Sequence, residues 1–305
     1  MTQPRRADPL PLGGEDGLPY SKGLMARALI ATGVSAVKAY ELAQQTEADL
    51  RGRGATVVEL ERLQELAEEV LGEEDARRAV RRLRRLRQLR SLEVPIIVLV
   101  GGATGTGKST VATEIAHRLG ITRVTSTDFI RQTMRAFFSP EFVPSVHYSS
   151  FEAGEGLPAA EREAGDPLLL GFLDQTRNVL VGVHASIDRA LEEGWSMVLE
   201  GVHLVPGMVP SSFGDALVVH AVLAIENEDI HVQHFWIRNA SPDGPRSHLK
   251  YVDKLSDIRH IQDFIVEEAG KTGVPVVQNG NIERAIDAVM ELVFDRADQL
   301  AAEKV

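Results

Sequence analysis

The hydrophobic pattern of residues 91–305 alternates between short apolar runs and longer stretches in which apolar residues recur at helical spacing. The short runs predict strands at Ile96–Val100, Arg123–Thr125, Met197–Leu199, Leu217–Leu223 and Val274–Val277. The longer stretches predict helices near 109–119, 128–137, 167–193, 227–238, 248–268 and 281–303. Strands that alternate with helices are typical of a parallel sheet with helices on both faces, so we predict an α/β domain here.

In residues 19–90 the apolar residues recur at helical spacing only, which predicts a small all-helical domain that precedes the α/β domain in the sequence. Its first three helices are expected near 20–30, 37–50 and 56–70. Residues 1–18 carry several prolines and glycines among charged residues, and we expect a flexible lead-in there.

The helical region ends in an arginine-rich segment, Asp75–Arg90, which contains eight arginines. Four apolar residues repeat at every third position along it: Val80, Leu83, Leu86 and Leu89. One stripe of this helix can therefore pack while the arginines stay solvated. A polyanion-binding helix is one interpretation; a charged connecting helix is favoured, because the segment has no aromatic residues that could stack on bases. Pro95 ends it.

Composition narrows the range of functions. The chain is 44% hydrophobic and 25% charged, as is ordinary for a soluble globular protein, and its net charge of −11 argues against a nucleic-acid partner. Its 305 residues include no cysteine, which fits a reducing compartment. No apolar run is long enough to span a membrane, and the start does not resemble a signal peptide. We expect a cytoplasmic protein with no membrane partner, and a homo-oligomer is compatible with the sequence.

A glycine-rich motif follows the first predicted strand. Gly102–Ser109 fits the pattern G-x-x-x-x-G-K-[ST], and a helical pattern begins directly after it. Glycines let the backbone turn so that its N–H groups cradle phosphate oxygens, and the helix adds its positive end. A dinucleotide-binding loop is excluded, because Thr110 stands where a third Gly or Ala would be required.

The motif predicts that the chain binds a nucleoside triphosphate and Mg²⁺. The side chain of Lys108 would reach the β- and γ-phosphates, and the Ser109 hydroxyl would ligate Mg²⁺. We expect the whole loop to contact the nucleotide: Gly102, Ala103, Thr104, Gly105, Thr106, Gly107, Lys108, Ser109 and Thr110.

Acidic residues follow two further strands. Ligands of open parallel sheets bind beyond the carboxyl ends of the strands, and Asp128 and Glu200 stand there. Asp128 would accept the proton of an attacking hydroxyl or hold Mg²⁺ through water. Glu200 is expected to hold Mg²⁺ indirectly, because it ends a strand beside the phosphate loop.

Several other side chains are candidates for binding an anionic acceptor. Arg131 and Arg135 lie on one face of a predicted helix, where their guanidinium groups can clamp phosphate or carboxylate. Arg238 and Arg246 fit a closing lid. The remaining candidates are Tyr148, Ser149 and Ser150, in a loop flanked by prolines, and His203, close to Glu200.

His231 and His234 are three residues apart, close to the spacing of metal ligands on a helix. No third ligand stands at a convincing spacing. The favoured interpretation is therefore a pair of partly buried or surface histidines.

Four segments resemble the 2-phosphoglycerate kinase family: Val100–Thr110, Thr125–Arg135, His147–Ser150 and Leu199–Gly207. The last segment, with its His and Pro, is much more specific than the phosphate loop. Residues 19–71 resemble the ATP-cone-type region that precedes the kinase domain in that family. The catalytic half is accordingly expected to have a P-loop fold of the nucleoside-monophosphate-kinase type.

The resemblance implies that ATP and 2-phosphoglycerate give ADP and 2,3-bisphosphoglycerate. A small anionic acceptor agrees with the arginines already identified. Two alternatives stay open at this point. One is a kinase acting on a nucleoside, sugar or inositol phosphate. The other is a regulatory ATP-binding module whose arginine-rich helix docks on RNA or an acidic partner.

Overall fold

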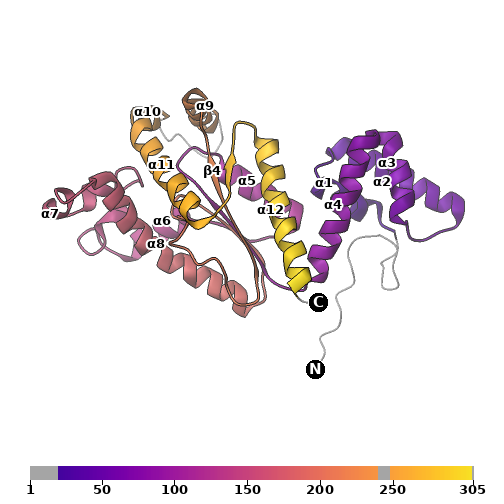
Figure 1. The fold of residues 1–305 in the computed structure, drawn as a ribbon, viewed down its shortest axis with the longest axis horizontal. Coiled ribbons are helices and arrows are strands. Elements are labelled where there is room, and N and C mark those ends of the chain that lie inside the picture. Colours follow the sequence, from indigo (N-terminus) through magenta and orange to yellow (C-terminus); the bar gives the residue numbers. More distant parts are fainter. Residues whose placement is uncertain (1–19, 240–247, 304–305) are drawn as a thin grey trace. The chain divides into compact units, whose positions relative to one another are not determined.

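The computed structural model describes residues 20–239 and 248–303, and these divide into two compact units (Figure 1). One unit runs to Glu93 and includes the ends of two later helices, His117–Gly120 and the residues from Ala297 onward. The other unit comprises Val94–Ala116 and Ile121–Arg296. The lead-in predicted for residues 1–18 lies outside the described residues.

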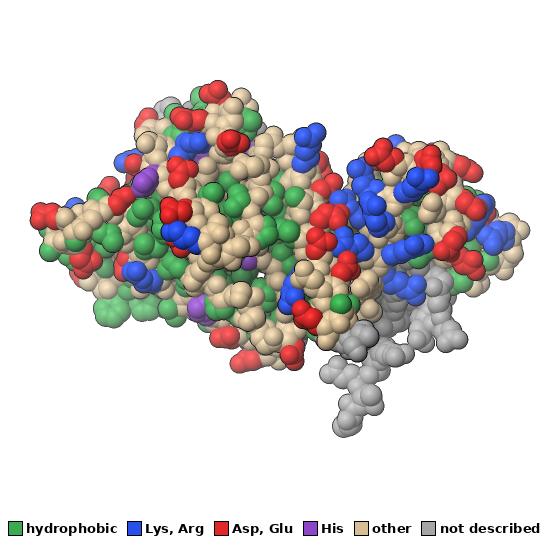
Figure 2. All heavy atoms as spheres, viewed as in Figure 1, with side chains coloured by type: hydrophobic (Ala, Val, Ile, Leu, Met, Phe, Trp, Pro, Cys, Tyr) green, Lys and Arg blue, Asp and Glu red, His purple; other side chains and the backbone are tan. Residues whose placement is uncertain are grey.

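The first unit consists mainly of four helices: α1 (Lys22–Ala31), α2 (Ala36–Arg53), α3 (Leu60–Leu71) and α4 (Glu73–Ser91). Each contributes its apolar face to one core, in which Met25, Leu42, Leu63 and Leu83 are fully buried. Helix α4 packs the predicted apolar stripe inward. Lys and Arg side chains gather over α4 (Figure 2).

The second unit is built on a parallel sheet of five strands in the order β2-β3-β1-β4-β5. The strands are β1 (Ile96–Gly101), β2 (Val124–Ser126), β3 (Met197–Glu200), β4 (Leu217–Ala224) and β5 (Val276–Gln278). The central strand β1 pairs with β3 and β4, and its residues from Ile97 onward are buried. A continuous apolar strand of this kind suits a sheet covered on both faces. The predicted α/β fold is confirmed.

Helices cover both faces of this sheet (Figure 1). On one face, Ile97 and Leu99 pack in a core with Val179 and Val183 of α8 (Pro167–Glu192). Helix α11 (Leu255–Thr272) lies on the same face as α8 (Figure 1). Side chains alternate along a strand, so the other residues of β1 point to the opposite face. Helices α5 (Lys108–Leu119) and α12 (Ile282–Glu303) cover that face (Figure 1).

Two local predictions differ from the structure. The helix predicted over 248–268 is interrupted at Lys254, which separates α10 (His248–Asp253) from α11. The loop around Tyr148 contains three short helical turns: η1 (Pro144–His147), η2 (Ala153–Gly156) and α7 (Ala159–Arg162). Turns of four residues are too short to produce a helical period in the sequence. Across the part of the chain that the structure describes, no helix is both long and apolar enough to cross a membrane.

Candidate functional site

The phosphate loop connects β1 to α5, and three of its glycines have positive φ angles. The φ angles of Gly102, Gly105 and Gly107 are 133°, 86° and 82°. A Cβ atom at Gly102 would collide with the Leu223 carbonyl, and one at Gly107 would collide with the Asn279 side chain. Only glycine satisfies both the backbone angles and the lack of space, which explains why the motif requires it here.

Three side chains outside the motif hold the loop by its carbonyl groups. Helix α9 (Glu228–Asn239) supplies His231, whose Nε2 lies 2.8 Å from the Thr104 carbonyl, and His234, whose Nδ1 lies 3.1 Å from the Gly105 carbonyl. Asn279, just after β5, donates its amide to the Thr106 carbonyl at 2.9 Å. In a trans peptide the N–H points opposite to the C=O, so the amide that follows each of these carbonyls points away from the side chain that holds the carbonyl. The Thr106 amide, for example, donates to the Ala103 carbonyl across the loop at 3.4 Å.

Burial lowers the pKa of His231 to about 4, so this imidazole is neutral near pH 7. Because its Nε2 faces a carbonyl oxygen, Nε2 carries the proton and donates it. The predicted helix over 227–238 is confirmed by α9. The sequence favoured partly buried or surface histidines over metal ligands, and His231 is indeed buried. Their contacts with the loop carbonyls were not predicted.

Lys108 and Ser109 begin α5 directly after the loop. Lys108 is buried, and its Nζ donates to the Ala103 carbonyl at 2.6 Å, so it folds back over its own loop. The Ser109 hydroxyl donates to Glu200 Oε1 at 3.0 Å. The sheet register explains this contact, because Val100 of β1 pairs with Glu200 at the end of β3. The two residues predicted to hold Mg²⁺ therefore lie together.

Helix α6 (Thr127–Phe137) follows β2 and carries Asp128 in its first turn. Both Nε and Nη2 of Arg131 donate to Asp128 Oδ1, at 3.0 and 2.7 Å. Nη1 of Arg131 donates to the carbonyls of Val146 and Tyr148, at 2.9 and 2.6 Å. Arg131 is thus a buried connection between α6 and the loop containing Tyr148, and its role in clamping an anionic acceptor stays a prediction.

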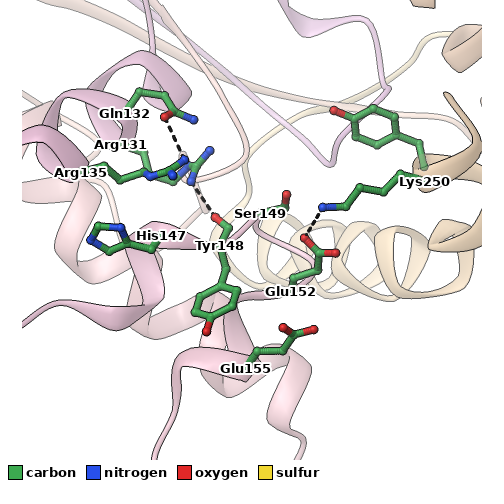
Figure 3. Close-up of a pocket in the computed structure, with 10 residues that line it drawn as sticks. Arg131, Gln132, Arg135, His147, Tyr148, Ser149, Glu152, Glu155 and Lys250 are labelled. Atoms are coloured by element: carbon green, nitrogen blue, oxygen red, sulfur yellow. Dashed lines mark hydrogen bonds and ion pairs between the residues drawn. The ribbon is translucent and has the colours of Figure 1, made fainter. Parts of the chain in front are cut away.

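A cavity of ≈ 590 Å³ opens beside α6 (Figure 3). It is lined by Arg131, Gln132, Arg135, His147, Tyr148, Ser149, Glu152, Glu155, Lys250 and Tyr251. Arg135 and His147 lie on one side of it and Lys250 on the other (Figure 3). Lys250 forms an ion pair with Glu152 at 2.6 Å. The predicted acceptor residues Arg135, Tyr148 and Ser149 are therefore brought together around one polar cavity.

Comparison with known proteins shows the family of this chain. A 2-phosphoglycerate kinase of Pyrococcus furiosus is 34% identical over 291 residues, covering 95% of this chain and 94% of that protein. A 2-phosphoglycerate kinase of Methanopyrus kandleri is 36% identical over 280 residues, covering 92% of this chain and 85% of that protein. The chain belongs to the 2-phosphoglycerate kinase family. No family model matches the sequence.

Solved structures are more distant from this 2-phosphoglycerate kinase family member. A gluconokinase from Sinorhizobium meliloti aligns with a TM-score of 0.38 and 15% identity, covering 69% of this chain and 98% of that one.

In this family member, two predicted acceptor residues lie away from the cavity lining. His203 is 1% exposed, with Nδ1 2.8 Å from Thr127 Oγ1 and Nε2 2.9 Å from Gln175 Oε1. Both ring nitrogens therefore have protein partners, which leaves none to meet a substrate. Ser150 is likewise buried. Arg246 and the side chain of Arg238 lie outside the described residues.

Sequence reasoning missed the residues from distant segments that line the cavity or hold the loops of the site. These are Asn279, Gln175, Glu152 and Lys250. None belongs to a short motif, and each acts across a separation of 27 or more residues in sequence. The position of Asn279 just after β5 was the one available signal, because ligands bind beyond the carboxyl ends of strands.

Proposed function

We propose that this protein transfers the γ-phosphoryl group of ATP to the 3-hydroxyl of 2-phosphoglycerate, giving ADP and 2,3-bisphosphoglycerate. Membership of the 2-phosphoglycerate kinase family supplies the reaction class. The structural observation that carries the proposal is the contact of Ser109 with Glu200, at 3.0 Å, immediately after the buried Lys108. This arrangement suits a triphosphate and its metal.

The loop would hold the phosphates through its amides, with Lys108 moving from the Ala103 carbonyl to the β- and γ-phosphates. A hydroxyl and a carboxylate are oxygen ligands of the kind that Mg²⁺ prefers, and Mg²⁺ usually keeps several waters. Ser109 and Glu200 therefore fit the ion, Glu200 directly or through water. Bound Mg²⁺ would offset the negative charge of the phosphates. Among the described residues, no group of three or more His, Asp or Glu side chains could hold a metal alone.

The acceptor would occupy the cavity beside α6. 2-Phosphoglycerate carries a carboxylate and a phosphate, and the cavity presents the cationic side chains of Arg135 and Lys250 on opposite sides (Figure 3). Two cations on separate walls suit a ligand with two separate anionic groups. Lys250 would exchange its ion pair with Glu152 for the acceptor.

In the transfer step, the oxygen of the 3-hydroxyl forms a bond to the γ-phosphorus while the bond from that phosphorus to the β–γ bridging oxygen breaks. ADP leaves with the electron pair of that bond. The proton of the hydroxyl passes to Asp128, whose side chain is 46% exposed and lies in the first turn of α6. Positioning and charge neutralisation would supply most of the rate enhancement.

An ADP-release assay over a panel of acceptors tests the proposal. The panel should contain 2-phosphoglycerate, 3-phosphoglycerate, glycerate, gluconate, a nucleoside, an inositol phosphate and no acceptor. We expect the highest kcat/KM with 2-phosphoglycerate. A higher kcat/KM with another acceptor would reject the proposed substrate, and no release above the acceptor-free rate would reject the kinase itself.

A further inference from the structure

We propose that Thr127, His203 and Gln175 form a buried hydrogen-bond chain that positions the acceptor-binding loop 144–148 relative to the first turn of α6. This inference rests on the proposed function, because it assigns the loop to the acceptor. The three residues act as positioning residues, since none of them lines the cavity.

The hydrogen-bond chain joins three elements that are distant in sequence. Thr127 is the first residue of α6, His203 follows β3, and Gln175 lies within α8. Thr127 and Gln175 are fully buried, and His203 is 1% exposed. Solvent therefore cannot replace a lost partner, and each broken bond would leave a buried polar group unsatisfied.

The direction of every hydrogen bond in the chain follows from Gln175. Its Nε2 lies 2.6 Å from the Ser145 carbonyl and 3.1 Å from the Tyr148 carbonyl. Carbonyls only accept, so the amide nitrogen is fixed at this end and Oε1 faces His203 as an acceptor. His203 must then carry its proton on Nε2.

Nδ1 of His203 is left with a lone pair, so the Thr127 hydroxyl donates to it at 2.8 Å. A neutral imidazole is required for this pattern. Burial, assisted by the charge of Arg131, lowers the pKa of His203 to about 3. The ring therefore stays neutral across the physiological pH range. Every hydrogen bond from Thr127 to the loop then keeps the same donor and the same acceptor.

The loop end of the chain is shared with Arg131. The Tyr148 carbonyl accepts from both Gln175 Nε2 and Arg131 Nη1, and Val146 accepts from Arg131 as well. Arg131 also holds Asp128. The chain and Arg131 thus place the proton acceptor, Asp128, and the cavity wall at Tyr148 in one rigid frame. The phosphate loop is held separately, by α9 and Asn279.

This separation gives the proposal a kinetic signature. Weakening the hydrogen-bond chain should weaken the binding of the acceptor without weakening the binding of ATP. Thr127→Val removes the donor while keeping the shape of the side chain, and Thr127→Ser keeps the donor. We expect Thr127→Val to raise KM for 2-phosphoglycerate roughly tenfold, with KM for ATP unchanged within twofold, and Thr127→Ser to restore the wild-type KM.

Gln175→Glu is the second variant, because a carboxylate cannot donate to the Ser145 and Tyr148 carbonyls. We expect Gln175→Glu also to raise KM for 2-phosphoglycerate while KM for ATP stays unchanged within twofold. Equal increases in both KM values, or no increase in a Thr127→Val protein with the wild-type melting temperature, would overturn the proposal.

A spectroscopic measurement tests the chain without any substrate. The ¹⁵N chemical shifts of the histidine rings report tautomer and protonation, and His203→Gln assigns the signal of His203. We expect a neutral ring protonated on Nε2 from pH 7.5 to pH 5. A proton on Nδ1, or a charged ring at pH 6, would overturn the chain even if kinase activity is present. Absence of activity with the predicted ring state would instead reject the proposed function alone.

Discussion

At the scale of single residues, the basic side chains of the candidate site differ in burial and in their hydrogen-bond partners. Lys108 is nine-tenths buried and bonded to the carbonyl of Ala103, so its charge is confined to the mouth of the loop. Arg131 and Arg135 lie one turn apart on α6, yet the first is buried and bonded to the protein and the second is exposed at the cavity. These differences lead to different expectations for their removal.

Lys108→Ala should lower kcat by at least about a hundredfold, or about 3 kcal/mol in the barrier, because the amine would stabilise charge on the transferring group. The melting temperature should stay close to wild type. Lys271→Ala is the matched control, since this exposed lysine forms ion pairs with Glu267 and Glu268 on its own helix, α11. Near-normal turnover of Lys108→Ala would contradict the role of the loop.

The two arginines of α6 should differ in what their removal changes. Arg135→Ala should raise KM for the acceptor and leave the free energy of unfolding within about 0.5 kcal/mol of wild type. Arg131→Ala should lower the free energy of unfolding by roughly 2–4 kcal/mol, because it removes the hydrogen bonds that the buried guanidinium donates to Asp128 and to the Val146 and Tyr148 carbonyls. Urea unfolding and steady-state kinetics measure both. Equal stability of the two variants would contradict the buried role of Arg131.

The site residues that could be predicted from the sequence belong to a contiguous motif or stand at the end of a predicted strand. Gly102 to Ser109 form one contiguous motif, and Glu200 follows from its place at the end of a strand. Glu152 and Lys250 could not be predicted, because their meeting depends on how η2 and α10 fold beside α6. His203 was predicted as a substrate contact because it is near Glu200 in sequence, whereas packing against Phe172 and α8 buries it.

At the scale of elements, the phosphate loop is held by α9 and by the segment after β5. His231 also stacks on Phe235, which in turn stacks on Tyr251 of α10, with ring centroids 5.2 and 5.3 Å apart. The helices and strands themselves were well predicted because their apolar periods are long. The break at Lys254 between α10 and α11 was not predicted, because no Gly or Pro marks it in the sequence.

Three histidines of the second unit give the fold a pH dependence: His203, His231 and His220, which lies on β4 with its Nε2 3.2 Å from the Leu204 carbonyl. Burial lowers the pKa of His203 to about 3 and those of His220 and His231 to about 4. The unfolded chain takes up protons near pH 6.5 while the folded protein does not, so stability falls as the pH falls. Between pH 6.5 and pH 5, each histidine should lower the free energy of unfolding by up to about 2 kcal/mol.

Thermal unfolding from pH 7.5 to pH 5 measures this effect. The window lies above the range in which most carboxylates titrate, so the histidines dominate it. His220→Gln should give a shallower dependence than wild type, because one contributing group is lost. A melting temperature that is constant over this range would contradict neutral, buried histidines.

On the scale of the whole molecule, the catalytic candidates Lys108, Asp128 and Glu200 lie in the second unit, and the arginine-rich helix α4 belongs to the first. Its arginines pair with acids: Arg77 with Glu73, Arg78 with Asp75, and Arg84 with Glu61. Pairing of this kind favours the interpretation of α4 as a charged connecting helix, because it offsets the positive charge that a polyanion would need.

Replacing exposed arginines of α4 should therefore leave catalysis intact. The double variant Arg81→Ala/Arg84→Ala should keep kcat and both KM values within twofold, since exposed ion pairs contribute little. Its melting temperature should fall by no more than a few degrees. A fivefold or larger change in kcat/KM would show that this helix contributes to the reaction.

Phosphorus NMR of a reaction mixture tests the central claim most directly. Wild-type protein is incubated with ATP, Mg²⁺ and 2-phosphoglycerate, with Lys108→Ala as the matched control. We predict that the γ-phosphate signal of ATP declines while a second phosphomonoester signal, coupled to the protons of the C3 methylene group, appears together with ADP. ATP that stays intact, or a free-phosphate signal that grows in place of the new phosphomonoester, would contradict the account.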